Sequence, residues 1–190
     1  MMDRKNTLLA VPSDFEEKLA IMHMIDRPLC DLRVTDFCAS SGVSRKRFYR
    51  LFKSKFDIVF WYYDVCNRMT LYEIGRTLTW GEAFTRQLIL LDEEHDFLAR
   101  ESASALADGR FAENRLRSFN KRKDILIETL EVYRGITVTH EIVMEVSIYA
   151  EMESVLMTQW LLGTSNLSLK EFVVMWEDCV PRQLHDALLG

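Results

Sequence analysis

The segment from Val34 to Lys55, VTDFCASSGVSRKRFYRLFKSK, constrains the fold of this chain more than any other stretch. A short segment with an apolar face is followed by Ser-Ser-Gly-Val and then by a second short segment. Gly42 suits the left-handed backbone conformation that ends a helix, and Ser44 is a favourable N-cap for the next one. The pattern predicts two short helices, about 34–40 and 44–52, joined by a tight turn, which is a helix-turn-helix.

The second of these predicted helices is strongly basic. Phe48 and Phe52 lie four residues apart and share one helix face. From Val43 to Phe56 there are six basic residues and no acidic one, although the whole chain has a net charge of -5. Because a helix presented to DNA needs positive charge near the phosphates, this cluster predicts contact with DNA. The six residues are Arg45, Lys46, Arg47, Arg50, Lys53 and Lys55.

The same stretch resembles the DNA-binding signature of the TetR/AcrR family of bacterial transcription regulators. Phe37 and Cys38 stand where that family usually has Ile-Ala, whereas Leu51 replaces a frequent histidine. The departures, which include Arg47 in place of a small residue, affect the expected operator sequence more than DNA binding itself. The residues that match at the family's spacing are Gly42, Val43, Ser44, Tyr49, Phe52 and Lys55.

The recognition helix should reach base edges through its N-terminal residues. We expect Arg45 or Arg47 to make at least one base contact, since arginine can pair with both major-groove acceptors of guanine. The resemblance implies phosphate contacts for Tyr49 and Lys55, and it places Arg33 where the family usually has a threonine. The predicted DNA-binding residues are Arg33, Thr35, Ser44, Arg45, Lys46, Arg47, Tyr49, Arg50 and Lys55.

The composition favours an all-α fold. The 190 residues include only seven Gly and three Pro, so helix breakers are few. No apolar run approaches the roughly 18 residues of a transmembrane helix, and the run Leu8–Val11 in the expected loose tail, residues 1–12, is too short for a signal peptide. The four cysteines show no Cys-x-x-Cys spacing. This usage is typical of reduced thiols in a cytoplasmic protein, without a zinc site or disulfides.

The charge distribution supports a division into two domains. Residues 1–60 carry eleven Lys/Arg against eight Asp/Glu, whereas residues 61–190 carry thirteen against twenty-one. A basic head on an acidic body suits a DNA-binding protein. We expect a helix-turn-helix DNA-binding domain in residues 1–55 and a helical ligand-binding and dimerisation domain in 56–190. A helix over about 54–76 should link the two.

Local signals predict where the helices begin and end. Ser13-x-x-Glu16 is a capping box that should start the first helix, and Pro28 should end it. Ser54-x-x-Asp57 should cap the linking helix. The remaining helices are expected over about 81–107 with a break near Ser102, over 111–133, over 139–162, and over 168–188 with a kink or split at Pro181.

The last two long helices, about 139–162 and 169–188, have broad apolar faces. In the family that the resemblance implies, these helices pair with their copies in a homodimer. The alternative is that they pack entirely within one chain. The resemblance also implies that the larger domain binds a small-molecule effector, which is not identified by the sequence. The apolar residues concerned are Ile142, Val146, Tyr149, Val155, Leu156, Trp160, Phe172, Val173, Met175, Trp176, Val180, Leu184 and Leu188.

Other functions have weaker support in the sequence. Asp92 and His95 could share a helix face, but a di-iron helical protein needs further Glu-x-x-His motifs, and none is present. His140 with Glu141 and Glu145 receives the same interpretation, a solvated helix face. No catalytic motif or phosphate-binding loop occurs, so no enzyme activity, metal or cofactor is expected. The alternatives left open are a TetR-like protein that acts through a protein partner and, less well supported, a helical metalloenzyme.

Overall fold

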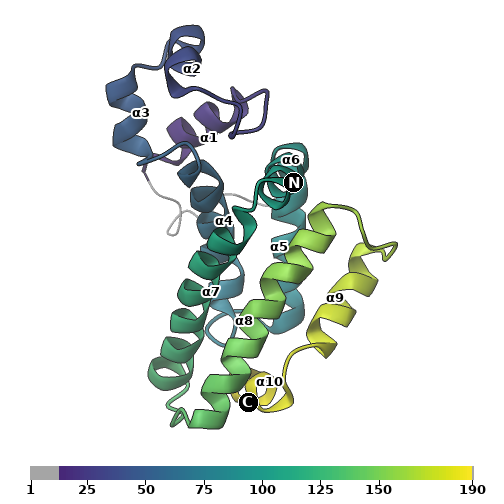
Figure 1. The fold of residues 1–190 in the computed structure, drawn as a ribbon. Coiled ribbons are helices and arrows are strands. Elements are labelled where there is room, and N and C mark those ends of the chain that lie inside the picture. The colour runs from purple at the N-terminus through teal and green to yellow at the C-terminus, as the bar shows by residue number, and fades with distance from the viewer. Residues whose placement is uncertain (1–12, 190) are drawn as a thin grey trace. The chain divides into compact units, whose positions relative to one another are not determined.

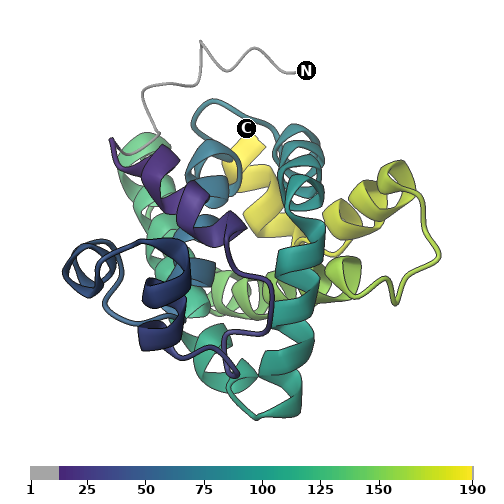
Figure 2. The same cartoon turned by 90° about the horizontal axis from the view of Figure 1, so that it is seen from above.

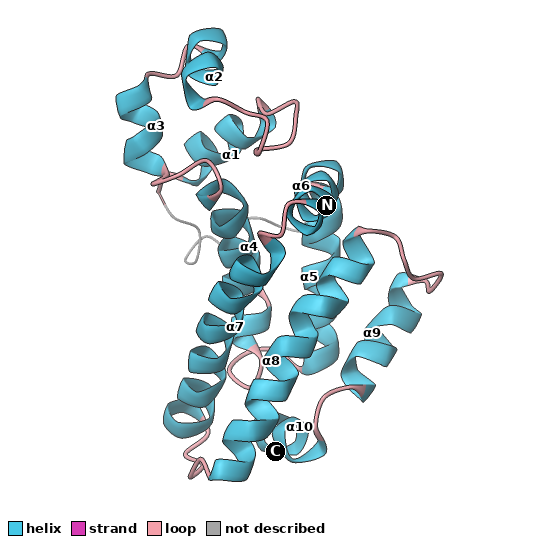
Figure 3. Cartoon of the chain, in the orientation of Figure 1, coloured by secondary structure: helices cyan, strands magenta, loops and turns pink. Residues whose placement is uncertain are grey.

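The computed structural model describes residues 13–189, in which helices are joined by loops and turns (Figures 1 and 3). They form ten α-helices, one short 3-10 helix and one π-helical segment, and no strand occurs among them. The predicted all-α class is confirmed. The chain divides into two compact units, one ending at Val65 and the other beginning at Cys66. The predicted tail, residues 1–12, lies outside the described residues.

The first unit is built around one cluster of aromatic rings, in which Phe37, Phe48 and Phe52 are buried. Phe48 contacts Phe37 with 6.0 Å between ring centroids and Phe52 with 5.8 Å. Trp61 continues the cluster, 6.0 Å from Phe52 and 5.6 Å from Phe15. Phe15, Phe37, Phe48 and Trp61 come from four different helices. The cluster therefore joins all the helices of this unit, which are α1 (Phe15–His23), α2 (Val34–Ser41), α3 (Arg45–Leu51) and the first part of α4 (Asp57–Met69).

The predicted helices on either side of Gly42 are both present. Gly42 ends α2 in the left-handed conformation, with φ of 74°. Ser44 is the N-cap of α3, and its hydroxyl accepts a hydrogen bond from the backbone N–H of Arg47 at 3.2 Å. Both features follow from local residue chemistry, which is why the sequence located them.

The capping contact that the sequence predicted is present at the start of α4 but not at the start of α1. The capping box at Ser13 is wrong, because the N-cap is Asp14 and no side chain caps the helix. At α4 the Asp57 carboxylate accepts hydrogen bonds from the backbone N–H of Ser54 at 2.8 Å and from its hydroxyl at 3.2 Å. The predicted pairing of these two residues is therefore present.

The helix α4 is shorter than predicted. It ends at Met69 and is followed by a 3-10 turn, η1 (Leu71–Glu73), in place of continuous helix to residue 76. Thr70 leaves the helical conformation with φ of -139°. Its hydroxyl lies 2.7 Å from the carbonyl oxygen of Cys66 and 2.5 Å from Oε1 of Gln87. A contact with a helix distant in sequence thus fixes this end, and no local signal announces it.

The second unit contains six further helices. The antiparallel pair α7 and α8 lies side by side, and the loop between α8 and α9 projects from this unit (Figures 1 and 2). The helix α9 packs on α5, where the Phe84 and Trp176 rings stack at 4.3 Å. The helices are α5 (Trp80–Glu93), α6 (His95–Ala107), α7 (Phe111–Glu128), which continues as the π-helical η2 (Thr129–Tyr133), α8 (His140–Leu161), α9 (Leu169–Asp178) and α10 (Arg182–Leu189).

Two predicted breaks in this unit have different outcomes. The predicted helix over 81–107 is interrupted at Glu94, not near Ser102. Acidic residues at the end of α5 oppose the negative end of the helix dipole, which explains the position of the break. The split at Pro181 is confirmed, because α9 ends at Asp178 and α10 begins at Arg182. The capping box of Ser168 and Glu171 that starts α9 is confirmed as well.

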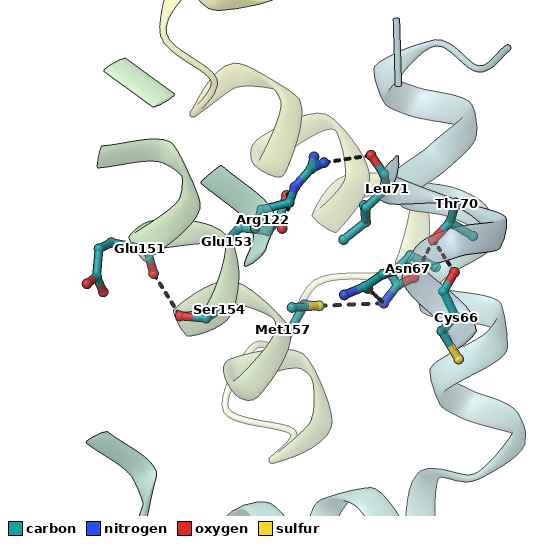
Figure 4. A network of polar contacts seen from close by, with 10 residues as sticks. Cys66, Asn67, Thr70, Leu71, Arg122, Glu151, Glu153, Ser154 and Met157 are labelled. Atoms are coloured by element: carbon teal, nitrogen blue, oxygen red, sulfur yellow. Dashed lines mark hydrogen bonds and ion pairs between the residues drawn. The ribbon is translucent and has the colours of Figure 1, made fainter. Parts of the chain in front are cut away.

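A buried ion pair lies inside the second unit. Nε of Arg122, on α7, lies 2.9 Å and 3.0 Å from the two carboxylate oxygens of Glu153, on α8. Nη1 of Arg122 donates to the carbonyl oxygen of Leu71 at 2.7 Å, at the 3-10 turn after α4 (Figure 4). Burial opposes the charge on Arg122, but the combined effects of Glu153 and Tyr149 raise the pKa of the guanidinium. The pair joins α7, α8 and the end of α4.

A second polar contact lies beside this pair (Figure 4). Gln87, on α5, is fully buried, and its Nε2 donates to Oδ1 of Asn67 at 2.9 Å. The same nitrogen lies 3.6 Å from the sulfur of Met157. Asn67 and Thr70 belong to the last turn of α4 and the residue that follows it. Gln87 of α5 therefore holds the end of α4, and Arg122 of α7 holds the turn that follows it.

Candidate nucleic-acid interface

The helix α3 buries one face and exposes the other. Phe48 has no exposed surface, whereas Tyr49 next to it is 47% exposed. The Tyr49 ring contacts the edge of the Phe48 ring, with 5.5 Å between centroids. The buried phenylalanine anchors the helix, so its other face is presented to solvent. That exposed face carries Arg45, Lys46, Arg47, Tyr49 and Arg50, all of them predicted DNA-binding residues.

Two of these arginines contact an acid that the sequence reasoning missed. Nε of Arg47 lies 2.5 Å from Oε1 of Glu17, on α1, and Nη2 of Arg50 lies 3.5 Å from the same oxygen. The hydrogen bond from Arg47 lowers the pKa of the Glu17 carboxyl, and the same contact raises the pKa of Arg47. Both arginine side chains remain more than half exposed. Glu17 is thirty residues from Arg47, so no local pattern connects them.

Lys55 is engaged with the chain's own backbone. Its Nζ donates to the carbonyl oxygens of Leu32 at 2.7 Å and Cys30 at 3.0 Å. It also lies 5.0 Å from the centroid of the Phe56 ring. These contacts tie the loop before α2 to the start of α4 and use two of the three ammonium donors. The phosphate contact of Lys55 stays a prediction that depends on the remaining donor.

The other predicted residues lie at helix starts. Arg33 is the N-cap position of α2 and is exposed, and no side-chain cap hydrogen bond forms there. Thr35, in the first turn of α2, donates from its hydroxyl to Oδ1 of Asp36 at 3.3 Å. The Ser44 hydroxyl accepts the capping bond described above, and its own proton remains available to donate to a phosphate. At the start of α4 the Asp57 carboxylate accepts from the backbone N–H of Ser54, so this donor is not available to a phosphate.

The metal cluster considered from the sequence does not have the expected geometry. Asp92 lies on α5 and His95 begins α6, so the two residues do not share a helix. Oδ1 of Asp92 instead accepts a hydrogen bond from Nε1 of Trp160 at 3.1 Å. Within residues 13–189 no group of three or more His, Cys, Asp or Glu side chains is arranged to hold a metal ion.

Among the helices of the described part of the chain, none combines the length and the apolar character needed to cross a lipid bilayer.

The predicted dimer helices are mostly buried within one chain. Most of the apolar residues named for this interface, including Phe172 and Trp176, pack inside the second unit. A narrower apolar stripe remains on α8, where Met144, Ile148 and Val155 are 50%, 61% and 36% exposed. Ile148 and Val155 lie four and eleven residues after Met144, so the three side chains share one face of the helix.

Comparison of the chain with known protein families, with curated proteins and with solved structures found no match. The functional interpretation therefore rests on the residues and contacts described above.

Proposed function

We propose that this chain is a TetR-like transcriptional regulator that binds a palindromic DNA operator as a homodimer. The observation that supports it most directly is the face of α3, which is basic and exposed while Phe48 anchors the opposite face in the core. A helix of this kind fits the major groove, with its first residues near base edges. Ser44 and Arg45 stand at the start of α3 and are therefore proposed to approach the bases.

The positive charge of this face is local. The chain as a whole has a net charge of -5, so a general attraction to nucleic acid does not explain six basic residues between Val43 and Phe56. An acidic body repels the DNA backbone, so the basic face should be the part of the chain that approaches it. This distribution favours binding through one defined surface.

The homodimer in this proposal is supported by the apolar stripe on α8. Three large apolar side chains on one face of a helix are unfavourable in water and are typical of an interface. A two-fold dimer would present two copies of α3, and binding to a palindrome requires their separation to be about 34–36 Å, one turn of DNA.

The stripe can be tested by changing Ile148 to lysine and measuring the molar mass by light scattering across a concentration series. If the dimer uses this face, the Ile148→Lys variant should dissociate into monomers. Leu106→Lys is the matched control, because Leu106 is a similarly exposed apolar residue, on α6 (46%). If the wild-type chain is monomeric, or if both variants remain dimeric, the stripe is not the interface.

The family resemblance leads us to include a small-molecule effector in the proposal. A small molecule bound by the second unit would change operator affinity if it favoured dimers whose recognition helices do not match the operator spacing. A coupling free energy of about 1–3 kcal/mol corresponds to a change of roughly 5–150-fold. Repression is the proposed outcome, and transcription from the operator's promoter that falls when the protein is present and recovers with the ligand would establish it.

DNA binding itself is tested by fluorescence anisotropy with duplexes from upstream of the chain's own gene. Wild-type protein should bind one short palindromic stretch, and its affinity should fall steeply between about 50 and 200 mM salt. Arg45→Ala should weaken binding roughly tenfold or more. Tyr49→Phe should reduce affinity less than Tyr49→Ala, because only the hydroxyl is lost.

The matched control is Lys170→Ala, which removes one exposed positive charge from α9 and should leave binding unchanged. Binding that is indifferent to DNA sequence, or equal losses in the α3 and α9 variants, would reject a sequence-specific regulator.

A further inference from the structure

The strongest unassigned contact on the predicted DNA-binding surface is the one between α1 and the arginines of α3. From it we infer that Glu17 is a positioning residue for sequence recognition, which holds the Arg47 guanidinium in place to contact a base. This inference rests on the proposed function, because it concerns how the same surface reads DNA.

The geometry of the contact leaves the part of Arg47 that reads bases available. Glu17 accepts from Nε of Arg47 at 2.5 Å, and Arg50 approaches the same carboxylate oxygen at 3.5 Å. A guanidinium carries five N–H donors in a planar fork, and Nε supplies only one of them. The four N–H groups on Nη1 and Nη2 of Arg47 are enough for a bidentate contact with guanine.

The position of Glu17 on α1 indicates that this contact is preferred over a local one. With Asp14 as the N-cap, Glu17 occupies the third helical position, where a glutamate usually reaches back to the cap backbone. Asp14 makes no side-chain cap bond here and pairs instead with Lys18 at 2.9 Å. Glu17 therefore uses its carboxylate on α3 and not on its own helix start.

The Glu17 carboxylate lies on the proposed DNA-binding surface, where it repels phosphates. We expect it to have a role in recognition that compensates for this repulsion. An unrestrained arginine binds phosphates of any sequence equally well, whereas an arginine held at Nε can use only one orientation of its fork. The negative charge of Glu17 weakens binding to every duplex by the same factor. Its hold on the Arg47 guanidinium is therefore what raises the ratio of operator affinity to non-specific affinity.

The test compares Glu17→Gln with Glu16→Gln. Both variants remove one negative charge from adjacent positions on α1, and the structure joins only Glu17 to Arg47. Dissociation constants are measured by anisotropy for a duplex selected by the wild-type protein from a random pool, and for a scrambled duplex of the same composition. Far-UV circular dichroism and a melting curve establish that each variant is folded.

Loss of charge alone should strengthen binding to both duplexes by the same factor, and this is the expected result for Glu16→Gln. Glu17→Gln should strengthen binding to the scrambled duplex but not to the selected one. The specificity ratio should fall about fivefold or more, the lower range of discrimination by one bidentate contact. In an Arg47→Ala background, Glu17→Gln should leave the ratio unchanged, because Glu17 acts through Arg47.

Two outcomes would overturn the inference in different ways. The first is that the wild-type protein discriminates between the duplexes and the Glu17→Gln and Glu16→Gln variants have the same specificity ratio. Glu17 would then act only through its negative charge, and the proposed function would stand. If the wild-type protein selects no sequence from the pool, both the inference and the proposed function fail.

Discussion

The buried pair of Arg122 and Glu153 gives the sharpest prediction about stability. Both side chains are almost fully buried, with 4% and 3% of their surface exposed. Replacing Arg122 by methionine leaves a buried carboxylate without its cation and removes a hydrogen bond to the Leu71 carbonyl. Replacing Glu153 by methionine leaves a buried guanidinium without its anion. Each change should lower the free energy of unfolding by about 3–5 kcal/mol.

The double variant Arg122→Met/Glu153→Met should be much more stable than the two single losses suggest. Neither buried charge remains, and methionine fills the space with apolar atoms. The Leu71 carbonyl keeps a long contact with the N–H of Ile74, at 3.5 Å. Its lost hydrogen bond should cost about 1–2 kcal/mol. The interaction free energy from the cycle should therefore be at least about 4 kcal/mol.

The chain supplies a matched control between the same two helices. Arg115 on α7 and Glu151 on α8 form an ion pair at 3.2 Å, with 40% and 43% of their side chains exposed. Because water screens an exposed pair, Arg115→Met should cost less than about 1 kcal/mol. The comparison isolates burial, since residue types and helices are the same.

The assay is urea unfolding followed by circular dichroism and tryptophan fluorescence, at one protein concentration because dimerisation would shift the midpoints. Losses below about 1 kcal/mol for both single variants would refute the reasoning, because they would mean that water reaches the charges. A double variant as unstable as the sum of the single variants would refute the pairing.

Two further predictions concern a turn and a helix start. Gly75→Ala should destabilise the chain by about 2–4 kcal/mol in urea unfolding, because φ is +75° and the new Cβ would lie 2.9 Å from Cδ2 of Leu188. Gly109→Ala has a similar φ of +80° with no neighbour within 4 Å and should cost only about 1 kcal/mol; equal losses would exclude the steric cause. Hydrogen bonds from Ser168 lower the pKa of the Glu171 carboxyl below its usual 4.5. The charged carboxylate therefore stabilises the folded state above pH 4.5, and this stabilisation is lost as the pH falls through the pKa of the folded state. Urea midpoints of wild type and Glu171→Gln should therefore differ at pH 7 and converge in acid, and a gap independent of pH would contradict this.

The sequence determined those features that depend on neighbouring residues. The glycine at position 42 and the cap at Ser44 located the turn between α2 and α3, and Ser168 with Glu171 located the start of α9. The four-residue spacing of Phe48 and Phe52 predicted which side of α3 is buried. These signals act within one helical turn, so they can be interpreted before any tertiary contact is known.

The tertiary structure alone decided what the charged side chains contact. The association of Glu17 with Arg47 and the use of Lys55 on backbone carbonyls join residues more than twenty positions apart. The end of α4 depends on Gln87 and Arg122 in the same way. The partner of a long charged side chain is set by which helices pack together, and that packing is decided by the summed burial of many apolar groups rather than by any local pattern.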